Sequence, residues 1–497
     1  MTSSKSMLSR RDLLLLAGAT AGSSLWPSLS LASKAEPLGE STLFFEPRHL
    51  TLWDTWVYFH GGKYYLYYLC APMNKTRKAP AGKADGVGLA ISKDGVHWED
   101  RGRVLDVSKK TFCGSGAVWP ALGPAGSQTR FIMNYSEWRG SEKSGRQTIF
   151  FAESHDLEHW TPLGTGSEFK QDTRWYERDG RWDNIWVVSR TGGGYFGYWA
   201  ANPKDKKPGI GLGESLDGVK WNSLPPPVLI DVPVSPEISA IREWKGKYYA
   251  LVSPPKAPVD LGNDTLIADS PFGPFRPSRK NRRLLAAHSS YFTRFIDTPD
   301  GLLVNHHSWV ADARPEYHPK RAQMAPLKRA VWDEEGTLRL KWWEGNEKAK
   351  RTQVPIELSR GVTDKTPALL SAAFGKEDAL VLEGMMSLPE SPTIARGLYL
   401  QGSGNQGTAI LVRPNGSVDY GSIQADGTQF EQKGSVDREL SFSDSVRFRL
   451  LRKGRLTEFY LDDFLMQCYC LPDIGTGRLG VIGWMDSFQK MNAWYCR

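Results

Sequence analysis

A chain of 497 residues is long enough for two or three domains, each with its own hydrophobic core. Its 49 Gly, 31 Pro, 19 Trp and 18 Tyr favour short strands joined by tight turns and argue against a mainly helical protein. The formal net charge of +8 is spread along the chain without a block of five basic residues, which argues against nucleic acid as a partner.

The N-terminal segment, residues 1–32, is typical of a twin-arginine export signal. The pair Arg10-Arg11 precedes an apolar stretch that begins at Leu13, and residues 30–32 have the small-x-small form of a cleavage site. Ser, Gly and Pro interrupt the apolar stretch, which is unlike a membrane anchor. The sequence therefore predicts a periplasmic or extracellular protein that is exported by this pathway and has no membrane span.

The cysteines give no sign of a zinc site, because none has CxxC spacing or a paired Cys/His pattern. An exported protein is permitted disulfides but does not require them. The five positions are Cys70, Cys113, Cys468, Cys470 and Cys496.

A repeat of about sixty residues fills the first two thirds of the chain. The segments AISKDGVHWED, AESHDLEHWTP and GESLDGVKWNS are closely related, and ADSPFGPFRPS is a looser copy. Their aromatic anchors are Trp98, Trp160, Trp221 and Phe275, at intervals of 62, 61 and 54 residues. Each copy predicts a strand, an Asp-Gly type of turn and a second strand.

A pair of aromatic or alternating strands precedes each copy, beginning with TWVYFHGGKYYLYYL, and a fifth unit begins at YFTRFIDTPDGLLVNHHSW. Five units of four strands over residues 44–345 predict an all-β protein with a five-bladed β-propeller. WD40 and kelch propellers fit less well, since their repeats are nearer 40 and 50 residues. A charged linker is expected at 346–364, followed by a β-sandwich at 365–497.

The start of the innermost strand in each blade lies near the propeller axis, so these starts converge although they are distant in sequence. In blades I, III and IV an acid stands there before an apolar strand: Asp54, Asp183 and Glu237. A lone acid at a strand start often caps a turn. Three acids at equivalent positions of a repeat indicate a common site instead.

Three carboxylates around one funnel repel each other, and desolvation raises the pKa of whichever is least well paired. Different protonation states at one pH are what an acid/base pair needs, and glycoside hydrolysis uses one protonated acid and one ionised carboxylate. Trp53 and Trp182, which flank the acids, are expected to stack on a sugar. The acids in Asp-Gly contexts, Asp94, Asp217 and Asp300, are assigned to turns.

On these motifs the chain resembles the five-bladed propeller superfamily of glycoside hydrolase families 32, 43 and 68, the furanosidase-like group. The resemblance covers residues 44–345 and, more loosely, the sandwich. It implies that Asp54 is the nucleophile or general base, that Asp183 is a non-reacting acid which stabilises the transition state, and that Glu237 is the general acid. The chain departs from the family motifs, because Thr55 follows Asp54 and Asn184 follows Asp183.

Further substrate contacts are expected at Arg139, Arg181, His288 and Arg294, for which an ion pair or hydrogen bond within the structure is an equal alternative. No cofactor or catalytic metal is expected. The resemblance leaves open a structural Ca²⁺ in the central channel near His306-His307, where some relatives hold calcium.

The sequence thus predicts an exported glycoside hydrolase that acts on a furanoside or related non-reducing-end sugar of an oligo- or polysaccharide. Two alternatives stay open. One is a sugar-binding propeller without catalysis. The other is a lyase or transferase on the same fold, and a lyase needs a Tyr or His base such as Tyr291 or His288.

Overall fold

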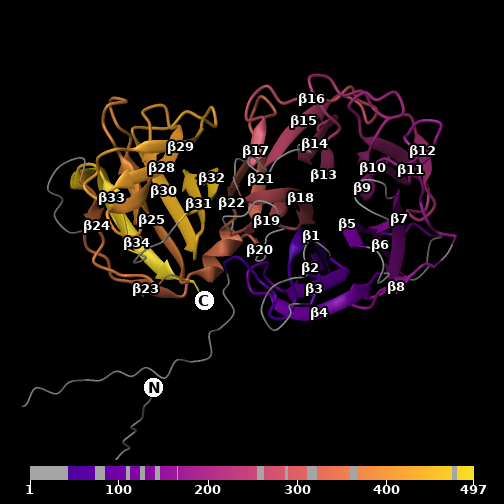
Figure 1. Cartoon of the computed structure of the whole chain (residues 1–497), viewed down its shortest axis with the longest axis horizontal. Coiled ribbons are helices and arrows are strands. Elements are labelled where there is room, and N and C mark those ends of the chain that lie inside the picture. Colours follow the sequence, from indigo (N-terminus) through magenta and orange to yellow (C-terminus); the bar gives the residue numbers. More distant parts are fainter. Residues whose placement is uncertain are drawn as a thin grey trace, which may run out of the picture. The chain divides into compact units, whose positions relative to one another are not determined.

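The chain folds almost entirely into β-strands, as expected (Figure 1). The structure, a computed structural model, describes residues 43–72, 84–107, 112–123, 129–139, 146–164, 166–253, 262–285, 289–310, 322–358, 366–375, 377–472 and 478–496. The expected export signal lies outside these residues. None of the helices among them has the length and apolar character needed to cross a membrane. The described residues belong to one compact unit.

Five antiparallel sheets form the blades of a β-propeller. Blade I contains β1 (Trp53–His60), β2 (Lys63–Cys70), β3 (Gly86–Ser92) and β4 (Glu99–Asp106). Blade II contains β5 (Phe112–Pro120), β6 (Phe131–Arg139), β7 (Arg146–Ser154) and β8 (Thr161–Pro162). Blade III contains β9 (Trp182–Ser189), β10 (Tyr195–Ala201), β11 (Gly211–Ser215) and β12 (Asn222–Leu224).

The last two blades carry one additional short strand each. Blade IV contains β13 (Glu237–Trp244), β14 (Lys247–Ser253), β15 (Asn263–Ala268), β16 (Arg276–Pro277) and β17 (Arg283–Leu285). Blade V contains β18 (Ser290–Thr298), β19 (Gly301–Trp309), β20 (Ala322–Met324), β21 (Lys328–Trp332) and β22 (Leu338–Trp342).

The repeated Ser-x-Asp sequence forms the turn between the outer strands of a blade. In blade I the Ser92 hydroxyl accepts the Gly95 N–H at 2.8 Å, and one Asp94 oxygen accepts the N–H groups of Val96 and His97 at 3.0 and 2.9 Å. The corresponding serine and aspartate of blades II and III make the same contacts. The acids of these turns therefore satisfy backbone donors, as expected for Asp94 and Asp217.

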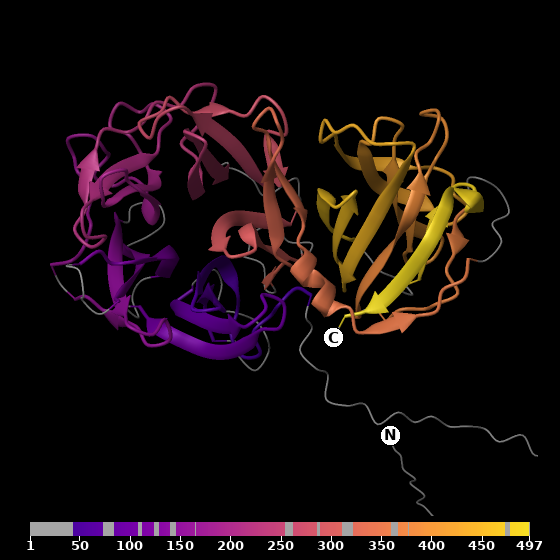
Figure 2. The ribbon, with the colours of Figure 1, turned by 180° about the vertical axis from the view of Figure 1, so that it is seen from behind.

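The inner strands follow one another around the ring, and β18 returns to β1 (Figures 1 and 2). The N-terminal end of the described chain completes blade V, because Phe45 and Met324 of β20 exchange two backbone hydrogen bonds of 2.9 Å. This pairing joins the beginning of the propeller to its last blade.

Each of the five inner strands is irregular just after its funnel end. The pairing register shifts at Asp54 in β1, after Gly114 in β5, after Asp183 in β9, at Ser239 in β13 and after Tyr291 in β18. Bulges re-aim side chains and leave backbone groups unpaired. The bulges explain why side chains from different positions of the repeat point into the same part of the funnel.

Buried asparagines satisfy the backbone at these bulges across blade boundaries. Asn134 of blade II exchanges two 2.9 Å hydrogen bonds with Ile185 of blade III. Asn184 donates to the Ile238 carbonyl at 2.8 Å, and the Thr293 N–H donates to Asn263 at 3.0 Å. Asn305 of blade V donates to the Thr55 carbonyl of blade I at 3.1 Å. These four asparagine side chains, called the asparagine clamps below, are at most 1% exposed. Each clamp forms a hydrogen bond with a backbone group at a bulge that lacks a strand partner and that water cannot reach.

A two-sheet β-sandwich follows the propeller. One sheet contains β23 (Thr352–Val354), β25 (Ala379–Ser387), β30 (Ser445–Lys453), β31 (Leu456–Leu461), β32 (Phe464–Cys470) and β34 (Phe488–Tyr495). The other contains β24 (Ala368–Leu369), β26 (Gly397–Gln401), β27 (Gln406–Val412), β28 (Val418–Gln424), β29 (Glu431–Val436) and β33 (Leu479–Ile482). The expected linker includes β23, which pairs with β34, so the sandwich sheet already begins inside that segment.

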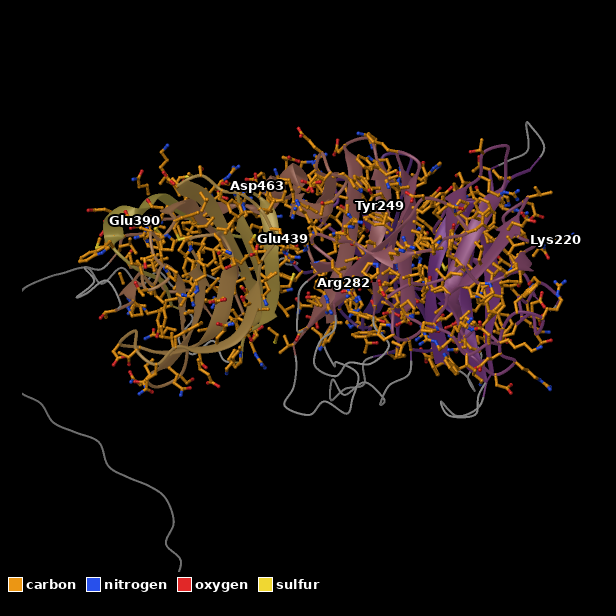
Figure 3. All side chains as sticks on the ribbon, turned by 90° about the horizontal axis from the view of Figure 1, so that it is seen from above. Lys220, Tyr249, Arg282, Glu390, Glu439 and Asp463 are labelled. Atoms are coloured by element: carbon orange, nitrogen blue, oxygen red, sulfur yellow. The ribbon has the colours of Figure 1, made fainter. Side chains whose placement is uncertain are left out.

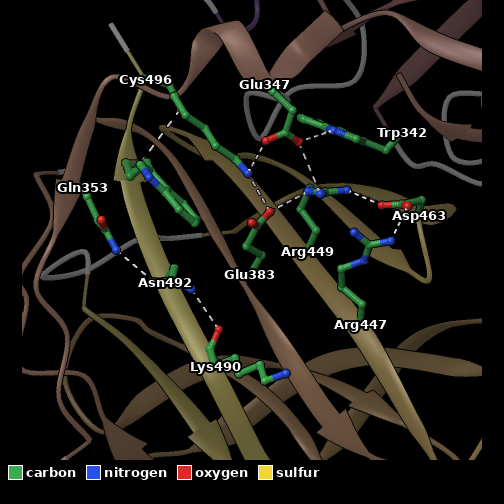
Figure 4. A network of polar contacts seen from close by, with 12 residues as sticks. Trp342, Glu347, Gln353, Glu383, Arg447, Arg449, Asp463, Lys490, Asn492 and Cys496 are labelled. Carbon is green, nitrogen blue, oxygen red and sulfur yellow. Dashed lines mark hydrogen bonds and ion pairs between the residues drawn. The ribbon is translucent and has the colours of Figure 1, made fainter. Parts of the chain in front are cut away.

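Blade V and the sandwich are joined by backbone and by charge. Lys341 of β22 pairs with Phe464 of β32, so the two sheets are continuous. Arg449 of β30 donates to Asp463 at 2.6 Å and to Glu383 at 3.0 Å, and it reaches Glu347 of the 3-10 helix η1 (Glu344–Ala349) at 3.4 Å (Figure 4).

Two further contacts cross the junction on the side of blade IV. The Asn281 N–H donates to Glu439 of the sandwich at 3.2 Å, next to Arg282 (Figure 3). Arg438 donates to the Asn281 side chain at 2.9 Å.

The junction also encloses a set of ionisable groups that are fully buried. Lys328 of β21 donates to Glu458 of β31 at 2.6 Å, and Tyr460 donates to the second oxygen of Glu458 at 2.7 Å. His306 of β19 lies 3.3 Å from Glu458. Burial alone raises the pKa of Glu458, but Lys328 and His306 lower it to about 2. Lys328 belongs to the propeller and Glu458 to the sandwich, so this buried ion pair forms only when the two domains are in contact.

Candidate active site

The three predicted acids begin, or nearly begin, their inner strands and meet at one point. Asp54, Asp183 and Glu237 are the second residue of β1, the second residue of β9 and the first residue of β13. Arg181 bridges two of them: its Nη2 lies 3.2 Å from Asp183 Oδ2 and 2.5 Å from Glu237 Oε1. Asp54 is close enough to both other acids for their charges to raise its pKa.

Asp183 is held by donors on two sides. The Ser136 hydroxyl of β6 donates to Asp183 Oδ1 at 2.6 Å, and Gln147 of β7 donates to that hydroxyl at 2.9 Å. Blade II therefore contributes the hydrogen-bond donors that hold Asp183, and not a further acid of the site. Its strand start has Gly114 because a Cβ there would lie 2.2 Å from Ser136 Oγ and 2.8 Å from Asp183 Oδ1.

Glu237 is the best paired of the three acids. One oxygen accepts Arg181, and the other accepts the hydroxyl of Tyr291 from β18. Burial alone raises the pKa of this carboxyl, but Arg181, the Tyr291 hydrogen bond and the charge of Arg294 together lower it below its ordinary value. The surroundings of Glu237 thus favour the ionised form, which is the opposite of what a resting general acid needs.

Asp54 has no comparable support. The residue is 8% exposed, and its buried Oδ1 has no hydrogen-bond partner among the residues that the structure describes. Its backbone lies at φ 28°, outside the usual regions for a residue with a side chain. Burial, and then the charge of Glu237, raise the pKa of Asp54 well above its ordinary value despite the opposing charge of Arg294. The surroundings therefore favour a neutral Asp54.

Arg294 is buried close enough to the three acids for their charges to act on it. It is 0% exposed, it donates to Asn184 at 3.1 Å, and its guanidinium lies over the ring of Phe292 at 4.1 Å. Its buried Nε and Nη2 find no hydrogen-bond partner in the described part of the chain. The expectation of a direct substrate contact at Arg294 is corrected by this burial: the residue acts on the site through its charge. Arg181, by contrast, keeps 35% of its side chain exposed beside the acids.

The two expected stacking residues have different environments. The ring of Trp53 is partly buried, stacks on Tyr291 at 6.0 Å between ring centroids and lies edge-on to His307 at 4.5 Å. Trp182 is 0% exposed, donates to the Phe169 carbonyl at 2.9 Å and packs against Trp199. The expectation for Trp182 is therefore corrected: it belongs to the core of blade III, since its ring turns away from the funnel.

Two other expected contacts cannot be placed from the structure. His288 lies outside the described residues. Arg139 ends β6, but its side chain is outside the described part.

Sequence reasoning did not assign Ser136 to the site, although it stands in the same strand as Arg139. It considered Tyr291 only as a base for a different reaction. A serine or tyrosine near a strand start is too common to be noticed without the fold.

The channel histidines point in opposite directions because they are consecutive in a strand. His307 packs against Trp53, and His306 faces the sandwich. Among the described residues, the ligand atoms of His306, Glu458 and Cys468 lie within 4.8 Å of one another. Lys328 already supplies the positive charge there, and one carboxylate is far fewer oxygen ligands than Ca²⁺ requires. None of the five cysteines, all of which lie among the described residues, forms a disulfide bond.

Comparisons with known proteins identify the architecture. No protein-family model matches the chain, and no curated protein sequence does. Among solved structures, a GH32 β-fructofuranosidase from Bombyx mori superposes with a TM-score of 0.68 over 93% of this chain and 95% of that one, at 16% identity. The chain shares the fold of a GH32 fructofuranosidase. At this identity the likeness concerns the fold alone.

Two further solved structures agree over nearly the full length. Sucrose-6-phosphate hydrolase from Lactobacillus gasseri gives a TM-score of 0.66 at 15% identity, covering 92% of this chain and 93% of that chain. Fructan 1-exohydrolase IIa from Cichorium intybus gives 0.66 at 14% identity, covering 92% and 97%. Related structures are a Bombyx mori aspartate-to-alanine variant in complex with sucrose and a Cichorium glutamate-to-glutamine variant in complex with 1-kestose. The GH32-like fold, a propeller followed by a sandwich, confirms the predicted architecture.

Proposed function

We propose that the protein is a glycoside hydrolase that cleaves O-glycosidic bonds in an oligo- or polysaccharide. The observation that supports this most strongly is the meeting of Asp54, Asp183 and Glu237 at the funnel ends of three inner strands. Their surroundings favour different protonation states, which is the arrangement that acid/base cleavage of a glycoside requires. The fold shared with fructofuranosidases supports the same reaction.

In this proposal Asp54 and Glu237 are the reacting pair and Asp183 is the third, non-reacting acid. Ser136 and Arg181 hold Asp183 in one orientation. Burial raises the pKa of Asp183, and the charge of Arg181 and the Ser136 hydrogen bond oppose this rise. In its ionised form Asp183 faces the positive charge that develops on the sugar ring in the oxocarbenium-like transition state. Trp53 stacks on Tyr291, the residue that donates to Glu237, and its ring is only partly buried. In this proposal the sugar packs against the Trp53 ring, which also excludes water from the site.

The substrate proposed is a furanoside or a related non-reducing-end sugar. Structures with the same fold hold sucrose and 1-kestose, which are fructose-containing oligosaccharides. The chain differs from the family motifs directly after Asp54 and Asp183, so the sugar and its linkage are for experiment to determine. The segment 1–32 supports export by the twin-arginine pathway to the periplasm or beyond.

A screen of pentofuranosides, fructosides, and sulfated and uronic glycans tests the proposal, with release of reducing sugar as the readout. Asp54→Asn and Glu237→Gln should each lower kcat on the best substrate by at least about 10³-fold, since each removes a reacting group. Glu390→Gln, on an exposed acid of the sandwich, is the matched control and should keep full activity (Figure 3). Turnover that survives both active-site substitutions would contradict the proposed site.

One observation keeps a lyase as the second candidate. Tyr291, a residue type that a lyase uses as its base, donates its hydroxyl to Glu237 at the centre of the site. Burial, and then the charge of Glu237, raise the pKa of Tyr291 well above its ordinary value, which makes it a poor base at neutral pH. Mass spectrometry of the products separates the two reactions, because a lyase product is unsaturated and lacks the added water.

A further inference from the structure

Gln147 of β7 connects the third acid to the backbone of blade III. Its side-chain Nε2 donates to the Ser136 hydroxyl at 2.9 Å, and that hydroxyl donates to Asp183 Oδ1 at 2.6 Å. Its Oε1 accepts the N–H of Trp182, the residue directly before Asp183, at 3.2 Å. One amide of blade II therefore holds the start of β9 twice, through the Trp182 backbone and, by way of Ser136, through the acid itself.

The Trp182 N–H fixes the orientation of this amide. A backbone N–H can only donate, so Oε1 of Gln147 faces Trp182 and Nε2 faces Ser136. The Ser136 oxygen accepts the Gln147 N–H, and its own proton is left for Asp183 Oδ1. Without Gln147 this hydroxyl is free to rotate and is no longer held as a donor to the acid.

Burial separates these contacts from the funnel. Gln147 and Ser136 are both 0% exposed, so neither side chain reaches a sugar and water cannot replace a lost partner. The second oxygen of Asp183 is held by Arg181 at 3.2 Å. The direction of the acid therefore depends on Ser136 and Gln147 on one side and on Arg181 on the other.

We propose that Gln147 is a positioning residue of the hydrolytic site, which acts through Ser136 to turn the Asp183 carboxylate toward the sugar. This inference rests on the proposed function and adds to that site a residue that does not touch the substrate. Asp183 remains the non-reacting acid. How well its charge stabilises the transition state depends on its direction, which is why a buried amide in the neighbouring blade affects the reaction.

The protonation of Asp183 depends on the same contacts. Burial raises its pKa, whereas the charge of Arg181 and the hydrogen bonds from Ser136 and Gln147 oppose the rise. Loss of the Gln147 hydrogen bond should therefore raise the pKa of Asp183 further. The other titratable groups that interact with its charge are Glu237 from β13, Asp54 from β1, Arg294 from β18 and Cys113 from β5.

Gln147→Met keeps the length of the side chain and removes both of its hydrogen bonds. On the best glycan from the screen we expect kcat to fall by about 10-fold or more while KM changes by less than about 2-fold, because Gln147 touches no substrate. The acid limb of the pH profile of kcat should move to higher pH, since Asp183 takes up its proton at a higher pH. A variant with the kcat and pH profile of the wild type would overturn the proposal.

Gln467→Met is the matched control, because Gln467 is a glutamine of the sandwich that is only 4% exposed. It undergoes the same substitution away from the acids and should leave kcat and the acid limb unchanged. An equal shift of the acid limb in both variants would contradict a specific part for Gln147.

A double-variant cycle with Ser136→Ala tests whether Gln147 acts through Ser136. If it does, Gln147→Met should lower kcat by less than about 2-fold once residue 136 has no hydroxyl. The same loss in both backgrounds would contradict the proposal, because Gln147 would then act independently of Ser136.

Neutron diffraction of the wild-type protein tests the hydrogen-bond directions without any substrate. We expect the deuterium of the Ser136 hydroxyl on the side of Asp183 and a deuterium of Gln147 Nε2 on the side of Ser136. A Ser136 deuterium that points to Gln147 would overturn the proposal even in an active enzyme. A wild type that hydrolyses no glycan of the screen contradicts the proposed function instead, whatever directions the neutron structure gives.

Discussion

Asp54 is strained at the level of the single residue, by its backbone conformation and by its unpartnered carboxyl oxygen. Active sites commonly retain such groups at a cost in stability. Replacing the group with a neutral amide of the same shape should therefore make the folded protein more stable.

The pH dependence of this effect follows from the raised pKa of Asp54. A carboxyl group whose pKa is higher in the folded state penalises folding once the pH exceeds its ordinary value of 3.8. Asp54→Asn should raise the thermal midpoint at pH 7, and the gain should shrink as the pH falls from the raised folded-state pKa towards 3.8 and be lost below that value. Glu237→Gln should have the opposite sign at pH 7, because it leaves Arg181 without its main partner. Differential scanning calorimetry between pH 3 and pH 8 measures both, and an equal rise in the two variants would contradict the account.

Gly114 allows a second residue-scale prediction. A methyl group there would collide with Ser136 and Asp183, so Gly114→Ala should displace the third acid. We expect kcat to fall by about 10-fold or more, in line with the cost of a misplacement of about 1 Å. Ser115→Ala is the matched control, since the neighbouring Ser115 hydroxyl has no partner to lose. Steady-state kinetics on the best substrate from the screen distinguish them.

Bulges and asparagine clamps set the funnel geometry at the level of the strand. Strand starts could be predicted from the sequence because the repeat and the alternation of apolar residues mark them, and Trp53, Trp182 and Glu237 do begin β1, β9 and β13. The direction of each side chain could not be predicted. Consecutive side chains of a strand face opposite sides, and this is why Trp182 lies in the core although it precedes an acid of the site; the bulges after these strand starts change the alternation further along.

Asn305 is the asparagine clamp that joins the last blade to the first, so we expect its loss to destabilise the closed ring of blades. Asn305→Ala would leave the Thr55 carbonyl buried without its side-chain donor, at a cost of about 1–3 kcal/mol. Asn222→Ala, on an exposed asparagine of β12, should change the free energy of unfolding by less than about 0.5 kcal/mol. Urea unfolding followed by tryptophan fluorescence gives both values, and equal values for the two variants would show that the clamp adds nothing.

For the whole molecule, the contact between propeller and sandwich depends on charges that come from both. Lys328 and Glu458 are fully buried, so removing one partner leaves the other as an unpaired charge. Lys328→Met should cost about 3–5 kcal/mol, whereas the double variant Lys328→Met/Glu458→Gln should recover a substantial part of this loss. Thermal unfolding of Lys328→Met, Glu458→Gln and the double variant tests the pairing. A double variant that is as unstable as the sum of the two single variants would contradict it.

The propeller could be predicted from the sequence, because a sixty-residue repeat has few other interpretations. The fold comparison confirms it. The contacts between propeller and sandwich could not be predicted, because Glu458 and Lys328 are 130 residues apart and neither belongs to a recognisable motif. The electrostatic roles were also out of reach. They depend on donors such as Tyr291 and Ser136, which only the three-dimensional arrangement brings to the acids.

The proposed function places glycoside hydrolysis in one funnel site with three carboxylates, Asp54, Asp183 and Glu237. The most direct test compares the wild type, Asp54→Asn, Glu237→Gln and Glu390→Gln on one hydrolysed glycan from the screen, with the products identified by mass spectrometry. We expect a hydrated product, loss of at least about 10³-fold in kcat for the two active-site variants and full activity for Glu390→Gln. Hydrolysis that continues in both active-site variants would contradict it.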